Sequence, residues 1–132
     1  MSRSTFATAV VVLLLIPISS TLAQDELAAA ESAAKAGAET AEGKKFEEAL
    51  GSAFGRAHGS TIQSCAKEVK RADLSDFDLF LRIDEGGTVD QALVKPASTI
   101  ATCVRDKMPG WKALAPPHAG FWVKVGVNLK SK

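Results

Sequence analysis

Apolar residues recur at every third or fourth position between Phe46 and Val69, and at every second position in two later segments. The first spacing is typical of an amphipathic helix with one buried face, whereas strict alternation is typical of a half-buried strand. The alternating segments are 77–84 and 121–130, and their odd-numbered positions are apolar. We therefore expect one long helical region followed by strands that each present one face to a core.

Turn and cap residues divide the rest of the chain. The sequence Asp-Glu-Gly-Gly at 84–87 predicts a turn between the strand 77–84 and a second strand over 88–94, which together form a β-hairpin. Ser98 is a suitable cap for a short helix that ends at Pro109-Gly110. The order helix, strand, strand, helix, strand predicts a small two-layer α+β domain. Helices would cover one face of a three-stranded antiparallel-type sheet, and the other face can stay wet.

Three glycines interrupt the long helical region at intervals of four residues: Gly51, Gly55 and Gly59. Each costs about 1 kcal/mol relative to alanine inside a helix. We interpret the region as two helices that meet near Gly59, with Ser60 and Gln63 as the capping box of the second. The alternative is that these glycines, which share one helix face, let another element approach closely.

The amino-terminal part of the chain has a different composition. Arg3, the apolar run 6–18 and the small residue Ala23 are arranged as in a secretory signal peptide over residues 1–23, with cleavage before Gln24. Residues 24–43 are rich in Ala and Glu and hold almost no large apolar residue, so we expect a solvent-exposed helical or disordered leader. The folded domain is predicted over residues 44–132.

Charge and composition exclude some partners. The chain has 16 basic and 15 acidic side chains, and this near-neutral balance argues against a nucleic acid or an anionic membrane surface held by long-range attraction. After signal cleavage, no apolar run is long enough for stable membrane insertion. We expect a periplasmic or secreted protein.

The cysteines Cys65 and Cys103 occur in two similar stretches, Ser-Thr-Ile-Gln-Ser-Cys at 60–65 and Ser-Thr-Ile-Ala-Thr-Cys at 98–103. We interpret each as a capped helix start with an inward cysteine one turn later, because the flanking residues do not repeat as a duplication would. Two inward cysteines on neighbouring helices of an exported protein predict a disulfide.

Other uses of the cysteines stay open. Cys65 and Cys103 could form a zinc site with His58 and His118, although structural zinc sites usually have closer ligand spacing. A catalytic thiol would pair Cys65 with His58, which lie about two helical turns apart. Nucleotide-binding, metalloprotease and serine-hydrolase motifs are absent from the sequence, so we expect no enzyme activity, no cofactor and no metal.

The stretches Arg56–Cys65, Phe77–Val89 and Ser98–Val104, followed by Trp111, a Pro-containing loop, Gly120 and a valine-rich last strand, resemble one branch of the TonB C-terminal-like domains. That branch has two cysteines and is related to gliding-motility proteins. The resemblance covers roughly residues 56–130. It implies a protein-binding module that engages a partner by adding a strand to an exposed sheet edge. The chain has no Pro-rich spacer and, once the signal is cleaved, no anchor, so energy transduction is not expected.

Three functions follow as hypotheses. The first is an exported adaptor that binds a protein or peptide of the cell envelope through its open sheet face or edge, with Phe80 and Trp122 as candidate contacts. These aromatic residues lie on the strand faces opposite the core, where a large aromatic side chain is unexpected. The alternative to partner contact is that they pack on each other or under the Ala-rich leader. The second function is a structural or stress-related envelope protein without a discrete ligand. The third is a thiol redox or zinc-binding protein that uses Cys65 and Cys103.

Overall fold

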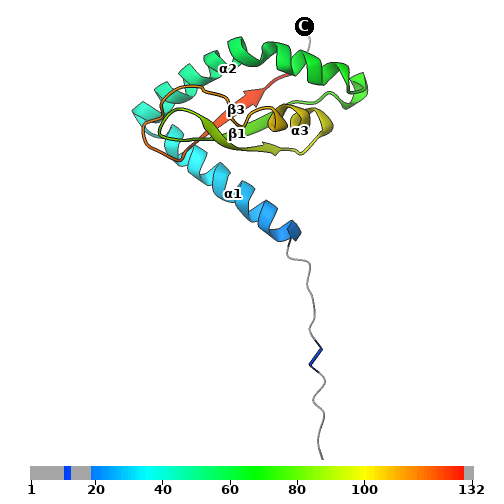
Figure 1. Ribbon diagram of the computed structural model, residues 1–132, viewed down its shortest axis with the longest axis horizontal. Helices are drawn as coiled ribbons and strands as arrows, with labels where there is room; N and C mark the ends of the chain where they lie inside the picture. The colour runs from blue at the N-terminus through cyan, green and yellow to red at the C-terminus, as the bar shows by residue number, and fades with distance from the viewer. Residues whose placement is uncertain (1–10, 13–18, 130–132) are drawn as a thin grey trace, which may run out of the picture.

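The computed structural model describes residues 11–12 and 19–129 (Figure 1). Two long helices come first, followed by a β-hairpin, a short helix and a last strand. The elements are α1 (Ser19–Ala38), α2 (Ala41–Lys67), a 3-10 turn (Arg71–Asp73), β1 (Phe77–Ile83), β2 (Val89–Lys95), α3 (Thr99–Asp106) and β3 (Phe121–Val127).

The three strands form one antiparallel sheet in the order β2-β1-β3, so β1 is central and the other two are edges. The β1–β2 turn is closed by Asp84, whose carboxylate accepts a hydrogen bond from the Thr88 amide at 2.9 Å. Gly87 has φ +88° there, which favours glycine. The predicted hairpin and the α+β fold with an antiparallel sheet are confirmed.

The main core lies on the face of the sheet that carries the odd-numbered residues of β1 and β3, and β2 adds Val89 and Val94 to this face. Helices α2 and α3 both pack on this face, and the aromatic rings of Phe46 and Phe121 meet edge to face at 5.4 Å. Ser98 caps α3 as predicted, since its hydroxyl accepts a hydrogen bond from the Ala101 amide. The strand residues of this core are Phe77, Leu79, Leu81, Ile83, Val89, Val94, Phe121, Val123, Val125 and Val127.

The expectation of two helices meeting near Gly59 is wrong. α2 is one continuous helix, and Ser60 lies inside it rather than at a cap. Its cap is Thr40, whose hydroxyl accepts a hydrogen bond from the Gly43 amide at 2.9 Å. The apolar spacing continues on both sides of Gly59, and the burial that it provides outweighs the small helix penalty of the glycines. The two cysteine stretches therefore differ in structure, because only the second begins at a helix cap.

Helix α1 changes the expected picture of the second sheet face. Ala30 and Ala34 are only 1% and 4% exposed, and they pack with Phe80 on the face opposite the main core. The Ala/Glu-rich segment was expected to be exposed, but α1 buries one side against the sheet and adds a third layer (Figure 1). The expectation that this face stays exposed to solvent therefore holds only in part.

Most of the predicted signal peptide lies outside the described residues, and the expected cleavage point before Gln24 falls inside α1.

Candidate functional site

The predicted disulfide is present. Cys65 on α2 and Cys103 on α3 are bonded, with their Cα atoms 5.8 Å apart, and the described residues contain no free cysteine. Cys65 is fully buried in the main core and Cys103 is half-buried beside it. The bond links the two helices that cover the same face of the sheet, and disulfides are typical of oxidising compartments.

The two histidines lie in different aromatic contacts. The ring of His58 meets Trp111 edge to face at 4.5 Å, and its Nδ1 lies 3.3 Å from the Thr61 hydroxyl. The ring of His118 packs on Phe121 at 5.2 Å. Burial lowers the pKa of His58 below its ordinary value. Among residues 11–12 and 19–129, no three His, Cys, Asp or Glu side chains are grouped so that they could hold a metal ion.

Phe80 and Trp122, the candidate partner contacts, lie together on the second face of the sheet. Phe80 is 3% exposed beneath Ala30 and Ala34 of α1, and Trp122 is half-buried against the same cluster. These aromatic residues were interpreted either as contacts for a partner or as packed on each other or under the Ala-rich segment. The structure shows them packed under that segment. Partner binding by Phe80 and Trp122 stays a prediction, and it requires α1 to leave this face.

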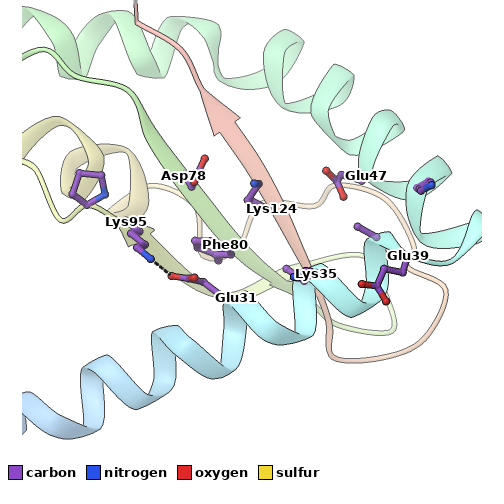
Figure 2. A pocket seen from close by; sticks show the side chains of 12 residues that line it. Glu31, Lys35, Glu39, Glu47, Asp78, Phe80, Lys95 and Lys124 are labelled. Carbon is purple, nitrogen blue, oxygen red and sulfur yellow. Dashed lines mark ion pairs between the residues drawn. The ribbon is translucent and has the colours of Figure 1, made fainter.

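A cleft of about 830 Å³, which we call the α1 cleft, lies between α1, the start of α2 and the second sheet face (Figure 2). Phe80 lies among eight charged side chains in its lining, and the ion pair drawn there joins Lys95 to Glu31 at 2.9 Å. Because the lining includes Glu47 of α2 as well as residues of α1, the cleft extends past the outer edge of β3. The charged side chains are Glu31, Lys35, Glu39, Lys44, Glu47, Asp78, Lys95 and Lys124.

A second groove, the α2 groove, of about 390 Å³, lies on the other side of the same strand edge. It runs between α2 and the carboxyl-terminal half of β3. Gly51 and Gly55 belong to its lining, and a Cβ atom added to either glycine would meet no atom within 4 Å. Glu47 and Lys124 line both grooves. The lining of the α2 groove consists of Glu47, Glu48, Gly51, Phe54, Gly55, Ile62 and residues 124–128.

The two edges of the sheet differ. The start of β2 is already paired, because the Val89 amide donates to the Trp111 carbonyl at 2.9 Å and the Val89 carbonyl accepts from the Gly110 amide at 2.9 Å. A bridge between Thr88 and Lys112 continues this pairing. Within residues 19–129, no strand or bridge pairs with the outer side of β3. The carboxyl-terminal half of β3 therefore offers a main-chain edge beside the α2 groove, whereas at the start of the strand the ring of Phe121 lies against Gly37 of α1.

Sequence reasoning found the disulfide, but it did not find the grooves. The four-residue spacing of Gly51, Gly55 and Gly59 was the available signal, and close approach of another element was an open alternative. In the described chain no other element approaches these glycines. The grooves depend on the angle between α1, α2 and the sheet, which no local pattern records.

The chain matches no protein-family model, no curated protein and no solved structure. Its resemblance to TonB C-terminal-like domains thus stays an expectation, and the site is argued from its own geometry. No helix within the described residues is both long enough and apolar enough to cross a membrane.

Proposed function

We propose that this protein is an exported adaptor that binds an extended peptide segment of a cell-envelope protein along the outer edge of β3. The observation that carries the proposal is the unpaired outer edge of β3, with the α2 groove beside its carboxyl-terminal half. An added strand would make main-chain hydrogen bonds to β3 and direct alternate side chains to the two sides of the sheet.

The two grooves fit such a strand. Side chains on one face of the added segment would enter the α2 groove, and those on the other face would point toward the α1 cleft, because the grooves share Glu47 and Lys124 at the strand edge. The empty space over Gly51 and Gly55 leaves room for side chains of the segment. The disulfide supports the part of the proposal that concerns export, because stable disulfides form in oxidising compartments.

A selection from a phage-displayed library of random peptides against the oxidised, full-length mature protein tests this function. We expect recovery of extended sequences with alternating apolar residues. Binding of a selected peptide should shift the amide resonances of residues 124–128 and of the groove side of α2 in a ¹⁵N correlation spectrum. Shifts confined to another surface would contradict the assignment to β3.

Groove-filling variants add a control for folding. Gly55→Leu places a side chain in the α2 groove, while Gly59→Leu places the same side chain on the same helix outside the groove lining. Leucine favours helix over glycine, so both variants should fold. We expect Gly55→Leu to weaken binding of the selected peptide at least tenfold and Gly59→Leu to leave it unchanged. Equal loss in both variants would argue against the groove.

A structural envelope protein without a ligand is the second candidate. It would follow if the folded, oxidised protein selects no peptide. The zinc alternative needs thiolate sulfur, whereas both sulfur atoms are in the disulfide in this structure. For the thiol redox alternative, this disulfide would be the oxidised state of the cysteine pair.

A further inference from the structure

The α2 groove has an acidic end. Glu47 and Glu48 stand on α2 next to the glycines, and neither carboxylate has an ion pair or hydrogen bond within the described residues. The base in the described lining is Lys124, which pairs in register with Phe80 and therefore lies on the face of β3 toward α1. On the α2 side the groove presents two unpaired negative charges.

The other end of the groove is apolar and open. Phe54 is 4% exposed and Ile62 is half-buried, and they flank the space over Gly51 and Gly55. We propose that the α2 groove selects, from extended peptide segments, those with a lysine or arginine opposite Glu47 and Glu48 and an apolar side chain over Gly51 and Gly55. This inference rests on the proposed function and assigns the chemistry of the partner segment.

Helix and strand dimensions fix the spacing of the two side chains. Gly55 follows Glu48 by seven residues, which is about 10 Å along a helix. An extended chain covers this distance in about three residues, and side chains on one face of a strand are separated by an even number. The base and the apolar residue should therefore be two or four positions apart in the partner segment.

The expected charge effect is modest. Glu48 is exposed and Glu47 half-buried, so solvent screens their attraction for a partner cation. Exposed ion pairs change an affinity by only a few-fold each. The two carboxylates together should raise the affinity for a peptide with a lysine or arginine about three- to tenfold. A library selection detects such a difference in affinity as enrichment of lysine or arginine at one position of the selected peptides.

The test repeats the peptide selection on the wild type and on Glu47→Gln/Glu48→Gln. The matched control is Glu68→Gln/Asp73→Asn, which removes two exposed carboxylates outside the groove. We expect the wild type and the control to enrich peptides with Lys or Arg two or four positions from an apolar residue. The groove variant, Glu47→Gln/Glu48→Gln, should still select peptides but without this enrichment. A selected peptide whose base is replaced by norleucine should bind wild type three- to tenfold more weakly and the groove variant with unchanged affinity.

The outcomes separate this inference from the proposed function. If no peptide is selected by any variant, both fail. If peptides are selected without a base, or with a base that persists in Glu47→Gln/Glu48→Gln, the charge selection is wrong and binding along β3 stands.

Discussion

Cys65 on α2 and Cys103 on α3 are joined by a disulfide that ties together the two helices covering the main core. The residues are 38 positions apart, and the loop that they close includes β1 and β2. The covalent link therefore restricts the unfolded chain across the entire hairpin. It also keeps α2, which forms one wall of the α2 groove, attached to α3.

Removal of the disulfide should strongly destabilise the protein. Closing a loop of this length contributes roughly 4 kcal/mol to the free energy of unfolding in the chain-entropy model. We expect Cys65→Ala/Cys103→Ala to lose about 3–4 kcal/mol, measured by urea denaturation. Reduced wild type is the control and should lose a similar amount. If the free energy of unfolding falls by less than 1 kcal/mol in both proteins, the disulfide does not stabilise the fold by restricting the unfolded chain.

Two glycines of α2 should respond in opposite directions to the same substitution. A Cβ atom at Gly43 would lie 1.7 Å from the Gly37 carbonyl oxygen, whereas one at Gly59 would meet nothing within 4 Å. Gly43→Ala should lower the free energy of unfolding by about 1–3 kcal/mol through overpacking at the α1–α2 turn. Gly59→Ala should raise it by about 0.5–1 kcal/mol because alanine favours helix. Thermal and urea unfolding check both, and a destabilised Gly59→Ala would indicate a contact absent from this structure.

The packing of α1 can be tested without disturbing the main core. Ala34 is buried over Phe80, while Ala33 is exposed on the same helix. Ala34→Asp places a charge in an apolar contact and should detach α1. We expect hydrogen-exchange protection of residues 24–38 to fall at least tenfold while β1 keeps its protection.

Ala33→Asp is the matched control for this experiment and should leave the protection of α1 unchanged. If Ala34→Asp instead unfolds α1 and the sheet together, α1 belongs to the same cooperative unit as the main core. The variant also exposes Phe80 and Trp122, so it provides the form of the protein in which partner binding by these two residues can be measured.

The strands and α3 were predictable because their patterns are local. Alternation in the segment that became β3 identified its buried valines, and Ser98 identified the start of α3. The packing of α1 was missed because Ala30 and Ala34 carry little apolar surface of their own, and they are buried only because the large ring of Phe80 lies opposite them. α2 was divided in error because the glycine signal was given more weight than the apolar spacing that continues through it. The α2 groove was missed because it forms between elements that are far apart in the sequence.

The stability of the protein should depend on pH through His58. Its ring lies against Trp111, its Nε2 atom is buried without a hydrogen-bond partner in the described residues, and burial lowers its pKa in the folded state. The unfolded chain, with an ordinary histidine pKa of about 6.5, binds a proton more readily than the folded protein. The contribution of His58 to the free energy of unfolding is therefore largest above this value. It decreases as the pH falls from about 7 toward the lowered folded-state pKa.

Urea denaturation between about pH 7 and pH 5 measures this dependence. His58→Gln removes the titrating group at this site and should flatten the pH profile over that interval. His118→Gln is the control, because its ring is exposed beside Phe121 and His58 is retained. We expect the control to keep the slope of the wild type. If His58→Gln keeps the full slope, the pH dependence arises elsewhere and the contact between His58 and Trp111 does not govern it.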